Sequence, residues 1–113
     1  MIDGYGNGGF TIAGNRHEGS MLVFPDRSLP WDAGKTDDIS LEALTHVFEF
    51  SKEIEILIIG CGPTFEAVPA GIREGLKAHG VVLEWMDTGA ACRTYNVLLA
   101  EGRRVAAALI ATD

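Results

Sequence analysis

The chain lacks the residues that build several common kinds of site. It has two cysteines, Cys61 and Cys92, with no CxxC spacing and no histidine cluster beside them, so we expect no metal site. No apolar run is long enough for an integral membrane segment. The first ten residues, MIDGYGNGGF, have no basic region followed by an apolar stretch, so we expect neither a signal peptide nor a mitochondrial presequence. These absences predict a cytoplasmic protein.

Positive charge is also scarce. Nine Lys and Arg residues stand against 16 Asp and Glu residues, which gives a formal net charge of −7. Phosphate backbones and anionic membrane surfaces repel such a chain on average, so we expect no nucleic-acid binding. The 47% of hydrophobic residues is typical of a folded globular protein, and 113 residues suit a single domain over residues 1–113.

Recognisable catalytic and cofactor motifs are missing as well. The chain has no GxSxG elbow, no HxxEH ligand set and no Walker loop. The segment LIIGCGPTFEAVPAGIREGLKAHG (57–80) begins like a nucleotide-binding turn, but Phe65 stands where GxGxxG requires its third glycine. We therefore expect no cofactor. Gly60 and Gly62 are better explained as a tight strand exit that packs a backbone crossing.

The second half of the chain has a regular alternation of helical and strand patterns. The expected order is a helix from Ser40, a strand over 53–60, a helix from Pro69 to Gly80, a strand over 81–86, a helix from Asp87 or Thr88 to Gly102, and a strand over 104–111. Crossovers of this length imply parallel strands with helices packed on the sheet.

The first forty residues give a weaker pattern. FTIAG (10–14) and SMLVF (20–24) are β-prone and predict an antiparallel hairpin, with NRHEG (15–19) as its loop. Residues 1–9 are expected to be an irregular lead-in, and residues 25–38 a loop that holds Trp31 against the core. The predicted fold class is α/β: a compact three-layer domain with a mixed central sheet, an N-terminal antiparallel hairpin and an α-β-α-β-α-β second half.

The carboxyl ends of the strands are the expected place for a ligand, because open α/β sheets bind ligands there. Arg93 lies near a helix N-terminus, against the helix dipole, which favours either a bound anion or a surface pair with Glu66 or Asp87. Cys92 in a first helical turn is open to a lowered pKa, although two small buried thiols are the default. The candidate pocket residues are Gly60, Cys61, Gly62, Thr64, Asp87, Thr88, Cys92, Arg93 and Asn96.

Three stretches together resemble a known family: GGFTIAGNRHEGSMLVFPDRSLPW, ILIIGCGPTF and VLEWMDTGAACRTYNVLLAEGRRVAAALI. The chain resembles the domain of unknown function 498 family from about Ile2 to Ile110. Relatives in that family include a mitochondrial assembly factor of respiratory complex I and the adipogenesis-associated domain protein. The resemblance implies a compact three-layer α/β domain, with no established enzymatic activity, cofactor or catalytic residue. Without a presequence, the chain looks like a free-standing bacterial-type member.

Three functional hypotheses remain open at this point. The leading one is a non-catalytic interaction domain, an assembly or accessory factor, that binds an unknown protein partner through an exposed apolar patch including Trp31 or Tyr5. The second is a small-molecule or anion-binding domain that uses the candidate pocket, and the third is a thiol-redox role of Cys61 and Cys92. The chain is expected to be a monomer or a weak homodimer.

Overall fold

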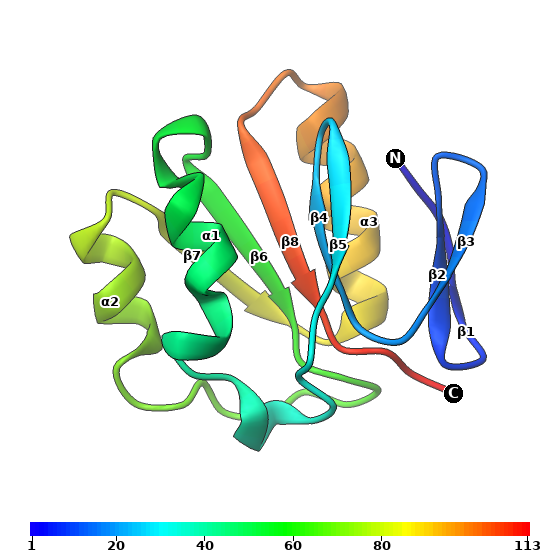
Figure 1. Cartoon of the computed structure of the whole chain (residues 1–113), viewed down its shortest axis with the longest axis horizontal. Helices are drawn as coiled ribbons and strands as arrows, with labels where there is room; N and C mark the ends of the chain where they lie inside the picture. The colour runs from blue at the N-terminus through cyan, green and yellow to red at the C-terminus, as the bar shows by residue number, and fades with distance from the viewer.

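Two β-sheets and three α-helices make up the fold of the computed structural model, which covers residues 1–113 (Figure 1). The smaller sheet has the order β1-β2-β3 and the larger one the order β5-β4-β8-β6-β7. The strands are β1 (Ile2–Gly6), β2 (Gly9–Ile12), β3 (Asn15–Glu18), β4 (Met21–Phe24), β5 (Arg27–Pro30), β6 (Ile56–Gly60), β7 (Val82–Met86) and β8 (Val105–Leu109). The α-helices are α1 (Thr45–Glu49), α2 (Ile72–Ala78) and α3 (Thr88–Ala100), and the short 3-10 turns are η1 (Thr36–Asp38), η2 (Glu42–Leu44) and η3 (Ser51–Glu53).

The larger sheet is mixed. β6 pairs in parallel with both β7 and β8, whereas β4 is antiparallel to β8 and β5. The chain runs α1-β6-α2-β7-α3-β8 through this region. The predicted α/β class and the α-β-α-β-α-β second half are therefore confirmed.

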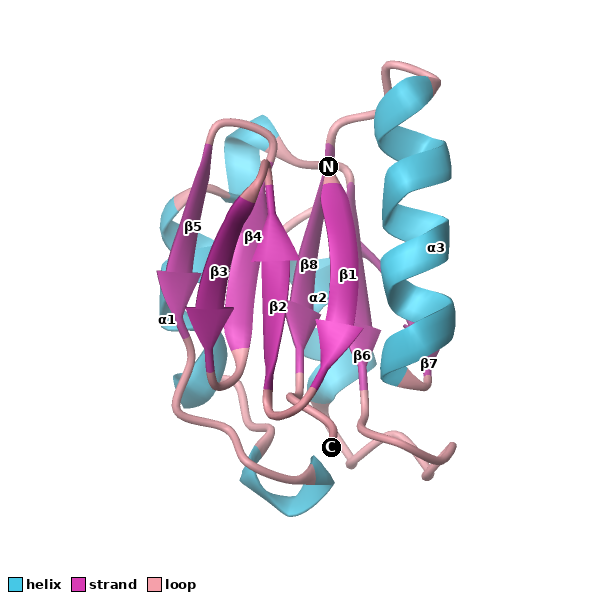
Figure 2. Ribbon diagram, turned by 90° about the vertical axis from the view of Figure 1, so that its right-hand side faces the viewer, coloured by secondary structure: helices cyan, strands magenta, loops and turns pink.

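Helices cover both faces of the central sheet. α1 and α2 lie on one face, while α3 and the small sheet lie side by side on the other (Figures 1 and 2). Every residue of β6 is buried, as a run of β-branched and aliphatic side chains predicts. Because neighbouring side chains point to opposite faces, Leu57 and Ile59 pack beneath α1 and α2, and Ile56 and Ile58 pack beneath α3.

The N-terminal prediction is wrong in its pairing. Residues 1–9 contain the strand β1, and residues 15–18 form β3 where a loop was expected, so β2 is the middle strand of a three-stranded sheet. β4 does not pair with β2 at all, because it belongs to the central sheet. The reason is local: Asn7–Gly8 and Ala13–Gly14 all have positive φ, which makes two tight two-residue turns in place of one wide loop.

The segment 25–38 is more ordered than predicted. Residues 27–30 form the edge strand β5, which pairs with β4. The prediction that Trp31 is held against the core is confirmed, since it is 7% exposed and its Nε1–H donates to the Ala43 carbonyl at 2.8 Å.

Two helix starts also differ from prediction. The helix expected from Ser40 is divided into η2, α1 and η3, and residues of modest helix propensity such as Thr45, Val47 and Phe48 occupy its centre. α2 starts at Ile72 and not at Pro69, because Gly71 has a φ of 88°, which no right-handed helix contains. The predicted helix ends at Gly80 and Gly102 are confirmed by their left-handed φ. No helix has the length and apolar character needed to cross a membrane.

Candidate functional site

Thr88 joins the two loops that follow β6 and β7. The Gly62 N–H donates to Thr88 Oγ1 at 3.0 Å, and that hydroxyl donates to the Ile110 carbonyl at 2.7 Å. The Thr88 N–H also donates to the Gly62 carbonyl at 2.9 Å. Thr88 is fully buried, so its polar groups are all directed to the backbone and none is presented to solvent.

Gly60 allows α3 to lie directly on the end of β6. A Cβ atom at this position would lie 2.9 Å from the Cα of Thr88 and 3.1 Å from the Cβ of Ala91. Real Cβ atoms do not approach backbone so closely, which means that any larger residue would push the helix away from the strand. The sequence-based explanation of this glycine, a close backbone crossing, fits this geometry.

Cys61 is also held by local bonds. Its N–H donates to the Met86 carbonyl at 2.9 Å, its carbonyl accepts from Thr36 Oγ1 at 3.0 Å, and its thiol contacts the Thr64 carbonyl at 3.5 Å. Cys61 is 1% exposed, whereas Thr64 is on the surface. The structure therefore brings Gly60, Cys61 and Thr88 together as a packed junction.

Asp87 and Arg93 have different roles at the start of α3. Asp87 caps the helix, accepting from the Ala90 N–H at 2.9 Å, as predicted. Arg93 is exposed and forms no ion pair, so the expected pairing with Glu66 or Asp87 is wrong. Its guanidinium and the Tyr5 hydroxyl both lie over Gly89 in the first turn of the helix.

Asn96 lies further along α3 and points to the small sheet. The Ile2 N–H donates to Asn96 Oδ1 at 2.8 Å, and Asn96 Nδ2 donates to the Ile2 carbonyl at 2.7 Å. Both polar atoms of the amide therefore bond to β1, so the Asn96 side chain attaches β1 to α3.

Burial controls the chemistry of Cys92. The residue is 3% exposed and packs in the core between α3 and the sheet. Loss of hydration raises the pKa of its thiol to about 12, and the nearby positive charge of Arg93 only partly offsets this. The possibility of a lowered pKa is thus wrong for Cys92, and both cysteines are free thiols.

No cavity of the structure is lined by any of the nine candidate pocket residues. The largest cavity, about 500 Å³, lies instead between α3 and the edge strand β7, with Ile56, Val82, Glu84 and Leu98 among its lining residues. No cluster of three or more His, Cys, Asp or Glu side chains could hold a metal ion. The geometry gives no support to ligand binding at the strand ends, and that pocket stays a prediction.

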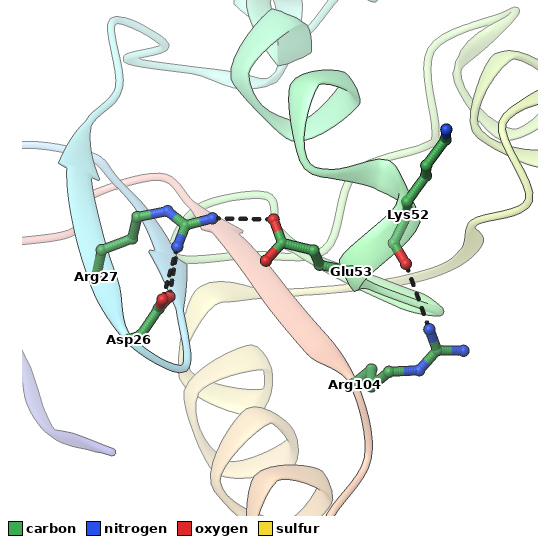
Figure 3. Close-up of polar contacts among 5 residues, drawn as sticks. All are labelled: Asp26, Arg27, Lys52, Glu53 and Arg104. Carbon is green, nitrogen blue, oxygen red and sulfur yellow. Dashed lines mark hydrogen bonds and ion pairs between the residues drawn. The ribbon is translucent and has the colours of Figure 1, made fainter.

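The contacts of Arg27 were not predicted from the sequence. Figure 3 shows Arg27 between Asp26 and Glu53, with Nη1 at 2.7 Å from Asp26 Oδ1 and Nη2 at 3.4 Å from Glu53 Oε2. The guanidinium carbon also lies 3.8 Å from the ring centroid of Phe50. Phe50 and Glu53 are far from Arg27 in the chain, so no spacing pattern could have revealed these contacts, which attach the β4–β5 turn to η3.

The comparison with known families decides the classification. The family model described as "Protein of unknown function (DUF498/DUF598)" matches residues 2–110. The chain belongs to this family. A relative in Danio rerio, NADH dehydrogenase (ubiquinone) 1 alpha subcomplex assembly factor 3, is 40% identical over 97% of this chain and 63% of its own length. The chain thus spans somewhat under two thirds of that assembly factor.

Solved structures of similar proteins share the fold. One, described as an outer membrane protein from Bartonella henselae, is 41% identical with a TM-score of 0.92, over 99% of this chain and 94% of its own. A protein from Rhodopseudomonas palustris is 47% identical with a TM-score of 0.86, over 98% of this chain and 82% of its own. The two-sheet architecture is therefore shared across these relatives.

Proposed function

We propose that this chain is a non-catalytic accessory protein that binds another protein during assembly of a respiratory NADH dehydrogenase complex. The observation that carries the proposal is the similarity to assembly factor 3 over nearly the whole chain, at 40% identity in Danio rerio and 34% in Homo sapiens. Two proteins that share a fold and over a third of their residues along their common length are suited to a similar binding task.

The geometry at the strand ends supports a binding role over a catalytic one. The side chains of Thr88, Cys61 and Asn96 all donate to backbone carbonyls within the protein. A catalytic group needs a free lone pair or proton directed at a reacting atom. The bonds of these side chains hold neighbouring segments of the protein together, which favours a structural role for them.

The apolar residues that are exposed to a partner differ from those that the sequence indicates. Trp31 is 7% exposed and cannot form part of an open patch, which corrects that half of the expectation. Tyr5 is 46% exposed, and Phe65, Val82 and Val97 are each more than half exposed. Aromatic side chains such as Tyr5 and Phe65 are common anchors in protein interfaces.

The test is to remove the protein from its native host and to recover its partners. We expect the deletion strain to lose assembled NADH dehydrogenase on a native gel and to regain it when the chain is supplied from a plasmid. A tagged copy should co-purify with NADH dehydrogenase subunits in a fixed ratio. Normal assembly in the deletion strain, or a tagged copy that recovers none of these subunits, would overturn the proposal.

Location is part of the same proposal. We expect the protein in the cytoplasmic fraction, where a partner subunit is available before it joins the membrane complex. Cell fractionation followed by immunodetection checks this, and recovery of the protein in another compartment contradicts it.

A further inference from the structure

β7 is an open edge of the central sheet. It lies at the end of the strand order and pairs with β6 alone (Figure 1). The helix α3 packs mainly over β6 and β8, and no strand pairs with the outer flank of β7, where the Arg73 side chain bonds to the Leu83 carbonyl. An open edge presents backbone groups that can bond to another strand.

The hydrogen bonds of β7 show which of its backbone groups are free. The Val82 N–H donates to the Glu55 carbonyl, and the Met86 carbonyl accepts from the Cys61 N–H, so the even-numbered residues face β6. Leu83 and Trp85 therefore direct their backbone groups outward. Arg73 Nη1 donates to the Leu83 carbonyl at 3.2 Å, and the Leu83 N–H and both backbone groups of Trp85 have no partner.

A cavity lies on each side of this edge. The α3-side cavity, about 500 Å³, is lined by Val82, Glu84 and Leu98 among others. The α2-side cavity, about 220 Å³, is lined by Arg73, Val81, Val82, Leu83 and Lys77. Successive side chains of a strand added to β7 point to opposite faces, so they would enter the two cavities in turn.

The two cavities carry opposite charge. On the α3 side, Arg103 is already paired with Glu55 at 2.9 Å, so the Glu84 carboxylate has no cation partner. On the α2 side, Arg73 and Lys77 have no carboxylate partner. A complementary strand would carry a basic side chain toward Glu84 and an acidic side chain toward Arg73 and Lys77.

We infer that the β7 edge binds an extended segment of a partner protein, which joins the sheet as an additional strand with a basic and an acidic residue on its two faces. This inference rests on the proposed function, because it names the surface by which an assembly factor holds its partner. The charges argue against a second copy as the occupant. Antiparallel pairing of two β7 edges about a two-fold axis would bring the Arg73 and Lys77 side chains of both copies to one face and both Glu84 carboxylates to the other.

The test uses a synthetic peptide with the purified chain. The peptide is an extended nine-residue sequence of threonine and valine with one lysine and one glutamate at adjacent positions, blocked at both ends. A matched peptide has glutamate in place of the lysine, so that both of its faces are acidic. We expect the first peptide to slow amide exchange at Leu83 and Trp85 and to bind at least about tenfold more tightly than the second.

Charge reversal in the protein sharpens the result. In Glu84→Lys we expect the preference to reverse, so that the all-acidic peptide binds better than the lysine-containing one. Glu18→Lys makes the same charge change on β3, in the other sheet, and should leave both affinities unchanged. Circular dichroism of each variant verifies that the fold is intact, since both side chains are on the surface.

Three outcomes would overturn the inference. The first is unchanged exchange at Leu83 and Trp85 with millimolar peptide, and the second is binding that ignores the charge at residue 84. The third is protection of these amides that rises with protein concentration in the absence of peptide, which identifies a second copy as the occupant. If NADH dehydrogenase subunits still co-purify while the peptide test fails, only the inferred binding at the β7 edge is wrong.

If the peptide binds as expected but no subunit is recovered, the proposed assembly role is wrong and the inferred binding at the β7 edge still holds.

Discussion

The side-chain amide of Asn96 makes two hydrogen bonds to the backbone of Ile2, at 2.8 and 2.7 Å, although 94 positions separate the two residues. The amide offers one acceptor and one donor, as a neighbouring strand would. α3 therefore serves as the partner that the first strand lacks on that side. An asparagine that the sequence suggests for a ligand pocket instead attaches the small sheet to the body of the protein.

Replacing Asn96 by alanine should loosen this attachment. Two partly buried backbone groups of Ile2 lose their partners, which should lower the free energy of unfolding by about 1–3 kcal/mol. Urea denaturation measures the loss, and faster amide exchange in β1 locates it. Asn15→Ala is the control, because the Asn15 side chain is exposed and makes only a 3.4 Å contact to Ala13. Equal losses in the two variants would contradict the role given to Asn96.

The contrast between the two halves of the chain shows what sequence patterns can predict. The run ILIIG is buried on both sides, and Gly80 and Gly102 end helices with a left-handed φ, so the local signals and the fold agree there. The small sheet offers weaker signals. β3 consists of the polar residues NRHE and is largely exposed, and it is a strand because β2 pairs with it.

One missed signal was present in the sequence. Asn7–Gly8 is a strong marker of a two-residue hairpin turn, and it would have placed β1 opposite β2. The Ala13–Gly14 turn could not be foreseen in the same way, since alanine seldom adopts a φ of 49°. The site was hard to predict for another reason: spacing placed Gly60, Gly62 and Thr88 at one edge, but only the structure shows that Gly62 bonds to Thr88 and that α3 packs on Gly60.

Gly60→Ala should destabilise the fold strongly. The added methyl group would lie 2.9 Å from the Cα of Thr88, which is backbone and cannot rotate away. Overpacking of this kind costs about 1–3 kcal/mol, so the thermal midpoint should fall by several degrees. Gly4→Ala is the matched control, because a Cβ there has no neighbour within 4 Å and the φ is not left-handed. A midpoint for Gly60→Ala as high as that of Gly4→Ala would show that α3 does not press on the strand.

The hydroxyl of Thr88 should matter more than its methyl group. Thr88→Val leaves the Gly62 N–H and the Ile110 carbonyl buried without this partner, a loss of at least about 2 kcal/mol. Thr88→Ser keeps both hydrogen bonds and removes one methyl group, for about 1 kcal/mol. Urea denaturation of the two variants ranks them. A valine variant as stable as the serine variant would mean that the hydroxyl does not hold the two loops together.

Cys92 should resist alkylation in the folded protein. Its thiol pKa is about 12 against an ordinary value of 9.0, so at pH 8 the thiolate fraction is lower by about three powers of ten. Iodoacetamide labelling followed by peptide mass mapping should give a rate about 1,000-fold below that of the same peptide in urea. Labelling of Cys92 at the unfolded rate under native conditions would contradict its burial, and it would favour the thiol-redox hypothesis.

Tyr95→Phe should stabilise the protein, most of all in alkali. The Tyr95 hydroxyl is buried with no hydrogen-bond partner, so its removal should raise the free energy of unfolding at pH 7 by up to about 1 kcal/mol.

Burial, with a smaller contribution from the charge of Asp26, raises the pKa of Tyr95 from 10.0 to about 12. The unfolded chain therefore loses this proton first, and the wild type should lose up to about 1.4 kcal/mol per pH unit between pH 10 and pH 12. The phenylalanine variant lacks this ionisable hydroxyl, so its stability advantage over the wild type should widen across that window, whereas Tyr5→Phe at an exposed position should follow the wild type. A variant less stable than the wild type at pH 7 would show that the hydroxyl of Tyr95 is bonded in solution. A constant difference from pH 9 to pH 12 would show that burial does not raise the pKa of Tyr95.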